Sequence, residues 1–225
     1  MRILMALALS LQEQTPEEIF RKIEQTIEAS KTLTVKFRWE EVDSGDGKGA
    51  SVSVGTGTIQ LGHDNKRRVD VRFLQVEGEI MDQTLTTISD GKKTWMRESV
   101  GETWHVGEGT LNNTKRLFAT MLTREGVIVS LFDPSHKSKT PYPISDIKAS
   151  DDDKGVKALT YKVQRIGGSK DSLDEVRLSY DPKSYRLFKR VNKRVVDGKN
   201  KILTEVFNEF TFNDDISDDV FKGER

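Results

Sequence analysis

The stretch Thr84-Leu-Thr-Thr-Ile-Ser-Asp-Gly-Lys-Lys-Thr-Trp95 decides the fold class, because it holds a strand, a tight turn and a second strand within twelve residues. Asp90-Gly91 favours a β-hairpin turn, since glycine tolerates a positive φ and aspartate can cap the turn. Ile88 precedes the turn and Trp95 follows it. An antiparallel hairpin is therefore expected near the middle of the chain.

Outward from this hairpin, apolar and polar residues alternate along most of the chain, as they do in half-buried strands. The segments with this alternation are 33–40, 52–61, 68–73, 102–106, 159–163, 176–180, 185–196 and 202–210. Within the last of them, Ile202, Val206 and Phe210 are expected on one face. Asp181-Pro182 and Asp197-Gly198 are turn signals between the later strands. The pattern predicts an antiparallel meander.

A helix is predicted near the start of the chain. Thr15 suits the N-cap, Glu18 completes a capping box, and Pro16 between them suits the first helical position. Ile19, Ile23 and Ile27 then recur every four residues, which places them on one helical stripe. The helix is expected to end near residue 30.

A second helical segment interrupts the strands at about 110–133. Its apolar residues form one broad helical face: Leu117, Phe118, Met121 and Leu122. Gly126 is expected to end or kink this helix, and residues 127–132 continue the apolar surface. We treat 110–133 as a helical insert that covers the sheet.

The composition indicates one β-rich domain over residues 15–225. The chain has 225 residues, 36 basic and 36 acidic, so its net charge is zero and no overall field favours nucleic acid. Only 35% of the residues are hydrophobic, which fits a curved sheet with one face in water. No linker divides the chain.

The first eleven residues are expected to be a signal peptide. Arg2 precedes an apolar run that is too short to cross a bilayer, which predicts export. The sequence has no cysteine, so disulfides, thiolate metal sites and a lipid-anchoring cysteine are excluded. We therefore expect a periplasmic protein that is not itself an anchored lipoprotein.

No catalytic or metal site is visible in the sequence. His63, His105 and His136 lie in three separate segments without metal-ligand spacing. No Gly-x-Ser-x-Gly motif occurs, and the run Asp151-Asp152-Asp153 reads as a solvated loop because neighbouring side chains diverge. We predict no enzyme activity, no cofactor and no metal.

The order of the segments resembles the LolA/LolB-like family of bacterial outer-membrane lipoprotein carriers. The resemblance is carried by a first helix, the strand Leu33–Trp39, a Gly-x-Gly strand at Gly55–Leu61, the Ile88–Trp95 hairpin, the helical insert, and the closing strand Val206–Phe212. The family's Arg-Pro after the second strand is absent, and so is its Phe-x-Phe-x-x-Pro ending. The chain thus resembles a divergent member.

This resemblance implies a mainly β fold with helices (α+β), in which a strongly curved antiparallel sheet forms a half-open β-barrel closed by helices. It also implies a non-catalytic carrier, active as a monomer, that binds a lipid or an acylated lipoprotein and exchanges it with membrane-associated donor or acceptor proteins. The residues expected to line the hydrophobic cavity and its lid are Phe37, Trp39, Ile59, Val71, Trp95, Leu117, Phe118, Met121 and Leu122.

Two alternatives stay open at the level of sequence. The same fold could serve as a periplasmic sensor or interaction module whose cavity is filled by its own side chains and whose sheet edge binds a partner. An enzyme would require a polar cleft with converging carboxylates, which no motif in the sequence indicates.

Overall fold

The strands β4 (Glu79–Asp90) and β5 (Lys93–Glu98) form the hairpin predicted from the sequence. The Asp90 carboxylate accepts hydrogen bonds from the backbone N–H groups of Lys92 and Lys93, at 2.7 and 2.8 Å. Gly91 has φ 92°, a conformation that costs glycine little. The turn therefore depends on the two residues that identified it.

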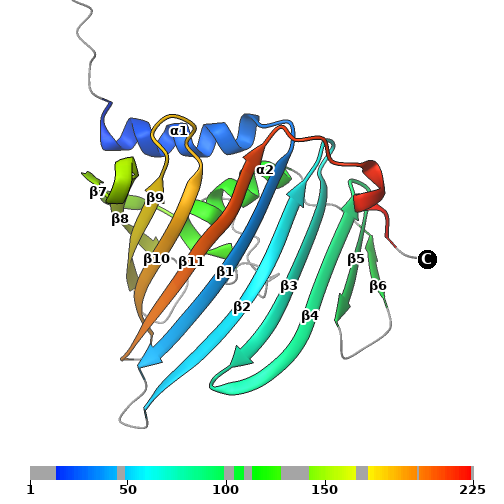
Figure 1. Ribbon diagram of the computed structural model, residues 1–225, viewed down its shortest axis with the longest axis horizontal. Helices are drawn as coiled ribbons and strands as arrows, with labels where there is room; N and C mark the ends of the chain where they lie inside the picture. The colour runs from blue at the N-terminus through cyan, green and yellow to red at the C-terminus, as the bar shows by residue number, and fades with distance from the viewer. Residues whose placement is uncertain are drawn as a thin grey trace, which may run out of the picture.

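The computed structural model describes residues 14–44, 49–98, 104–108, 113–127, 142–165, 172–196 and 198–223. Its main element is an eleven-stranded antiparallel sheet (Figure 1). The remaining strands are β1 (Leu33–Ser44), β2 (Ala50–Leu61), β3 (Lys66–Val76), β6 (His105–Glu108), β7 (Ile144–Asp151), β8 (Lys157–Arg165), β9 (Ser172–Tyr180), β10 (Leu187–Val196) and β11 (Lys199–Phe212).

Strand order follows the chain except at the centre of the sheet, where β1 pairs with β11. The order is β6-β5-β4-β3-β2-β1-β11-β10-β9-β8-β7, so β6 and β7 are the two edges. Within the described residues no ladder joins these edges, and the sheet is unclosed. The prediction of a mainly β, antiparallel fold with few helices is confirmed.

The helices are α1 (Pro16–Ala29), α2 (Thr114–Thr120), the π-helical turn η1 (Met121–Glu125), and the 3₁₀ turns η2 (Asp153–Gly155) and η3 (Asp218–Phe221). Figure 1 shows α1 running across one end of the strands and α2 behind the sheet. The predicted capping box is present: Thr15 N–H donates to Glu18 Oε2 at 2.9 Å, and Glu18 N–H donates to Thr15 Oγ1 at 3.2 Å.

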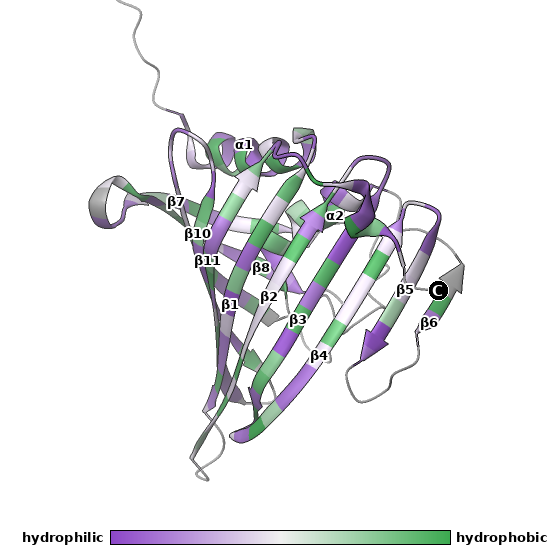
Figure 2. Ribbon diagram, turned by 45° about the vertical axis from the view of Figure 1, so that its right-hand side comes forward, coloured by the Kyte–Doolittle hydropathy of each residue, from purple (hydrophilic) through white to green (hydrophobic). Residues whose placement is uncertain are grey.

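Side chains that alternate along the strands divide the sheet into two faces, and Figure 2 shows the matching alternation of hydropathy. Val35, Ile59 and Val69 lie opposite one another across β1, β2 and β3, so they share a face. This face packs against Ile23 of α1 and Leu122 of η1. We call it the inner face.

Trp95 lies on the other, outer face, so its assignment to the inner cavity is wrong. The ladder aligns Gln60, Arg68, Ile88 and Trp95, one residue out of phase with the inner face. The C-terminal segment covers this side, since a Cβ added to Gly223 would lie 2.3 Å from the Trp95 ring. Because strand side chains alternate, a hairpin assigned one residue out of phase reverses its facing.

Three expectations fall outside the described residues. They are the signal peptide at 1–11, the continuation of the apolar insert at 128–133, and His136. Of the predicted insert at 110–133, the structure describes residues 113–127.

Gly57→Ala is expected to lower the free energy of unfolding by about 1–3 kcal/mol, because overpacking a filled core forces side chains off their rotamers. The new Cβ would lie 2.4 Å from Phe37 Cζ, and Phe37 is buried. Urea denaturation measures the change. The control is Thr58→Val on the outer face of β2, expected within about 0.5 kcal/mol of the parent. Equal midpoints for all three proteins would contradict this packing account.

Candidate functional site

The inner face of the sheet brings together most of the residues predicted to bind a ligand. Seven of the nine are at most 3% exposed and belong to one apolar cluster: Phe37, Trp39, Ile59, Val71, Phe118, Met121 and Leu122. Leu117 is half-buried and packs against the same cluster. Their role in binding stays a prediction, but the sheet residues and the residues of α2 and η1 pack together in one contiguous apolar cluster.

Two aromatic rings lie flat on β2 because glycines leave room for them. A Cβ on Gly55 would lie 2.5 Å from the indole nitrogen of Trp39, and one on Gly57 would lie 2.4 Å from Phe37. Trp39 also meets Phe73 edge-on, with ring centroids 5.8 Å apart. The Gly-x-Gly spacing noted in the sequence thus lets rings from β1 cover the neighbouring strand, and the floor of the site is filled by the protein itself.

Residues 114–127, comprising α2, η1 and the turn after them, form the lid segment. An ion pair ties it to α1: Arg124 Nη2 lies 3.1 Å from Glu24 Oε2, with both side chains mostly buried. Thr123 Oγ1 donates to Glu24 Oε1 at 2.9 Å, and the Arg124 guanidinium lies 5.4 Å from the Phe20 ring centroid. The lid is therefore oriented on α1 by charge as well as by apolar packing.

The start of the lid is tied to the end of α1. The Lys115 ammonium donates to the carbonyls of Ser30 and Lys31, the latter at 2.6 Å, where unpaired helix carbonyls attract a cation. Burial lowers the pKa of Lys115 below its ordinary value. Thr114 N–H donates to Asn65 Oδ1 at 3.1 Å, so the β2–β3 turn also contacts the lid.

The end of the lid is held by two buried side chains of the sheet. Arg190 of β10 donates through Nη2 to the Arg124 carbonyl at 2.9 Å, and Glu205 of β11 accepts from Val127 N–H at 2.6 Å. Arg190 Nη1 and Glu205 Oε2 are 3.3 Å apart, and both side chains are fully buried. The two side chains neutralise each other's charge, and together they bind one carbonyl and one N–H of the lid backbone.

Two further features fit the lid to this ion pair. Gly126 has φ 93°, and a Cβ there would lie 2.8 Å from Arg190 Nη1, so the close turn requires glycine. The Tyr161 hydroxyl donates to the Thr123 carbonyl. Burial raises the pKa of Tyr161, which keeps this hydroxyl protonated and able to donate. The carbonyls of residues 123 and 124 are thereby both satisfied.

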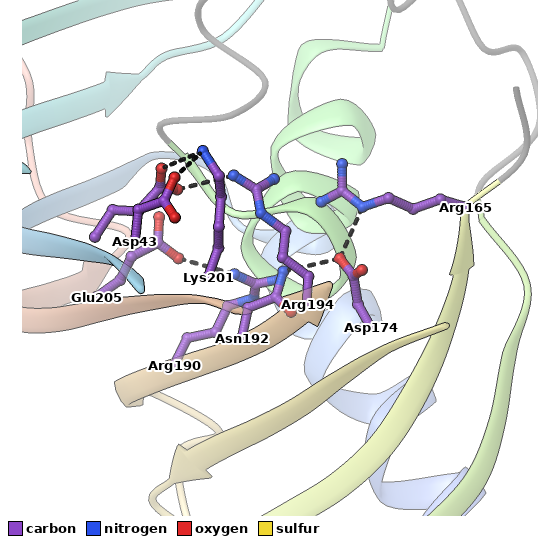
Figure 3. A network of polar contacts seen from close by, with 9 residues as sticks. Asp43, Arg165, Asp174, Arg190, Asn192, Arg194, Lys201 and Glu205 are labelled. Atoms are coloured by element: carbon purple, nitrogen blue, oxygen red, sulfur yellow. Dashed lines mark hydrogen bonds and ion pairs between the residues drawn. The ribbon is translucent and has the colours of Figure 1, made fainter. Parts of the chain in front are cut away.

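Polar contacts continue along the inner face away from the lid (Figure 3). Asp174 Oδ2 accepts from Arg165 Nε at 2.7 Å and from Asn192 Nδ2 at 3.0 Å. Arg194 Nη2 donates to Glu41 Oε2 at 2.8 Å. Lys201 Nζ lies 2.9 Å from Asp43 Oδ2 and 3.8 Å from Glu41 Oε1.

This network was not predicted from the sequence. Arg190, Asn192 and Arg194 occupy the inward phase of β10, where alternation with Val191 and Val195 suggests the opposite facing. In β11, Ile202 and Val206 are partly exposed on the outer face. A register shift against β1 then brings both Phe207 and Phe210 inward. The signal that could have revealed it is the presence of charged residues at positions of β10 and β11 that lie opposite each other, such as Arg190 and Glu205.

Other clefts lie at the surface of the described residues, and their linings range from mostly apolar to mostly polar. The largest of those described is about 490 Å³ and lies between the β2–β3 turn and the start of α2, lined by His63, Asn65 and Lys115 among others. No group of three metal-ligating side chains occurs among the described residues. None of the described helices is long and apolar enough to span a membrane.

No protein-family model matches the chain, and no curated protein matches it. Several solved structures are similar to it over most of its length. A LolA superfamily protein from Nitrosomonas europaea is 10% identical over 93% of this chain and 98% of its own, with a TM-score of 0.38.

Two further structures are similar over comparable lengths. A putative outer membrane lipoprotein-sorting protein domain from Vibrio parahaemolyticus is 10% identical over 92% of this chain and 97% of its own, with a TM-score of 0.40. A DUF1329 family protein from Desulfovibrio piger is 9% identical over 92% of this chain and 95% of its own, with a TM-score of 0.38. At these identities and TM-scores the matches do not show the function of this chain.

Arg190→Met is expected to lower the free energy of unfolding by about 3–5 kcal/mol, because it leaves the Glu205 carboxylate buried without its cation. The double variant Arg190→Met with Glu205→Leu should recover part of that loss. Urea denaturation of the three proteins measures both effects.

The matched control is Glu209→Gln, which breaks the exposed Lys36–Glu209 pair and should change stability by less than about 1 kcal/mol. A double variant as unstable as Arg190→Met alone would mean that the uncompensated charge is not the source of the loss.

Proposed function

We propose that the protein is a non-catalytic periplasmic carrier that binds the hydrophobic part of a lipid or an acylated protein between its inner face and the lid segment. The observation that carries the proposal is the way the lid is attached. An apolar face is covered by a separate helical segment whose backbone is held at one end by a buried ion pair.

Such an attachment suits a lid that opens as a unit. Hydrogen bonds to Arg190 and Glu205 are directional, so they are lost together when the lid moves rather than weakened gradually. Apolar packing alone tolerates sliding. Two discrete arrangements are the requirement for a carrier that must both hold and release its ligand.

Ligand and lid would compete for the same apolar surface. Phe118, Met121 and Leu122 now cover the floor formed by Phe37 and Trp39. An acyl chain that replaces them gains about 0.8 kcal/mol per buried CH₂, while the displaced lid side chains lose their burial. In this proposal the arrangement with the lid packed on the floor is the closed one, and binding opens it toward a half-open barrel covered by helices.

The chemistry of the site supports binding rather than catalysis. The charged side chains nearest the lid are paired with one another or bound to backbone groups. The carrier would collect its ligand from one membrane-associated partner and deliver it to another, acting as a monomer.

A second function is supported by the filled floor. The inner-face residues predicted to line the cavity are at most 3% exposed, so the apolar cluster is closed. A closed cluster is expected of a sensor or interaction module that holds no ligand and binds its partner at a sheet edge. The two functions differ in whether an acyl chain can enter.

Glu24→Gln is expected to strengthen binding of a fluorescent fatty-acid probe about three- to tenfold. Removing one partner of the Glu24–Arg124 pair weakens the lid, and a ligand that needs an open lid binds better when opening costs less. Fluorescence titration gives the affinities, and native mass spectrometry followed by organic extraction identifies any co-purified lipid.

Glu209→Gln is the control, because it removes the same charge from an exposed pair on the outer face. It should bind the probe as the parent does. If neither the parent nor Glu24→Gln binds the probe, and both purify free of lipid, the carrier is excluded in favour of the interaction module.

A further inference from the structure

The inner face changes from apolar to charged along the strands. The end of β1 that lies near α1 carries Val35, Phe37 and Trp39 on this face. The other end of the strand carries Glu41 and Asp43. The same change occurs on the four neighbouring strands. The resulting group, which we call the polar end, comprises Glu41, Asp43, Arg165, Asp174, Arg190, Asn192, Arg194, Lys201 and Glu205 (Figure 3).

The charges of the polar end balance. Four cations face four carboxylates, in the pairs Arg165–Asp174, Arg190–Glu205, Arg194–Glu41 and Lys201–Asp43. A group brought to this place meets both signs of charge. A net charge of either sign would therefore gain little attraction and would cost desolvation.

The polar end nevertheless has unused hydrogen-bonding capacity. Within the part of the chain that the structure describes, three buried donors have no partner: Arg165 Nη2, Arg190 Nε and Arg194 Nε. Three buried acceptors also have none among the described residues: Asp43 Oδ1, Asp174 Oδ1 and Asn192 Oδ1. Asp174, Arg190 and Asn192 are fully buried residues, where an unsatisfied polar atom is costly. Donors and acceptors are equal in number.

Exposure increases toward the rim. The Arg190 and Glu205 side chains are 0% exposed, whereas Lys201 and Glu41 at the strand ends are 25% and 23% exposed. The polar end thus extends from the lid contacts to the surface. A molecule lying along the inner face would have its apolar part near α1 and its polar part at this rim.

We propose that the polar end binds the headgroup of an amphiphile, and that this headgroup carries no net charge but has both hydrogen-bond donors and acceptors. The inference rests on the proposed function, because the apolar part of the ligand occupies the surface beneath the lid. Sugar hydroxyls and a phosphoethanolamine zwitterion both have this chemistry.

The test compares amphiphiles with one chain length and different headgroups. Dodecyl glucoside and lauroyl lysophosphatidylethanolamine are neutral and carry donors and acceptors, laurate is anionic, and dodecyltrimethylammonium is cationic. Each displaces the fluorescent probe from the full chain below its micelle-forming concentration. At least one neutral amphiphile is expected to bind about tenfold tighter than laurate and than the ammonium.

Two charge variants with partly exposed side chains test the residues. Asp43→Asn should shift the preference several-fold toward laurate, and Arg194→Gln should shift it several-fold toward the ammonium, because each removes one side of the balance. Asp82→Asn removes the same charge from an exposed pair with Arg72 and should leave the preference unchanged. Thermal melting establishes that all three variants fold.

The outcomes separate the inference from the function on which it rests. A preference for the glucoside or for the lysophospholipid supports the headgroup site. Which of the two binds more tightly distinguishes sugar hydroxyls from a phosphoethanolamine zwitterion. Equal binding of all four amphiphiles, or a preference that neither charge variant moves, overturns the headgroup site while leaving the carrier intact. Binding of none overturns both.

Discussion

The buried pair between Arg190 and Glu205 is the contact on which the arrangement of the other parts depends. Two charges out of water are tolerated only when their partners are well placed, and here the partners come from three different segments. β10 and β11 set the distance between the side chains, and the lid supplies a carbonyl and an N–H. A lid in another position would leave the pair's remaining hydrogen-bonding groups unmet.

That constraint explains local features that otherwise look unrelated. The π-helical turn η1 and the positive φ of Gly126 together present the Arg124 carbonyl and the Val127 N–H to the pair. Tyr161 on β8 satisfies the neighbouring carbonyl of Thr123. Apolar packing determines which face of the lid turns inward, whereas these polar contacts determine its register along the sheet. The polar contacts thus fix the position of the lid, whereas apolar packing stabilises it.

The elements with strong periodicity were predictable from the sequence. Leu33, Val35, Phe37 and Trp39 all face inward as their alternation indicates, and Phe118, Met121 and Leu122 form the buried side of the lid. The capping box and the Asp90-Gly91 turn are local signals and act locally. In each case one short stretch contains the whole physical reason for its structure.

What could not be predicted depends on partners distant in sequence. The edge strand β7 was missed because Ile144 and Ile147 are separated by a bulge around Asp146, which destroys the alternation. Trp95 was assigned to the wrong face because either phase of a hairpin is locally acceptable until the C-terminal segment around Gly223 covers one side. The polar end was missed because an arginine in a strand ordinarily points to water, and only neighbouring strands supply the carboxylates that bury it.

The pairing of β1 with β11 has a consequence for how the chain reaches its folded state. These two strands lie side by side at the middle of the sheet although nearly the whole sequence separates them. Closing so long a loop is entropically costly, and folds dominated by such distant contacts form slowly. The central ladder also cannot form on a nascent chain before its last strand has been synthesised. Until then the first strands have an unpaired edge, so the complete sheet can form only after the whole chain has been synthesised.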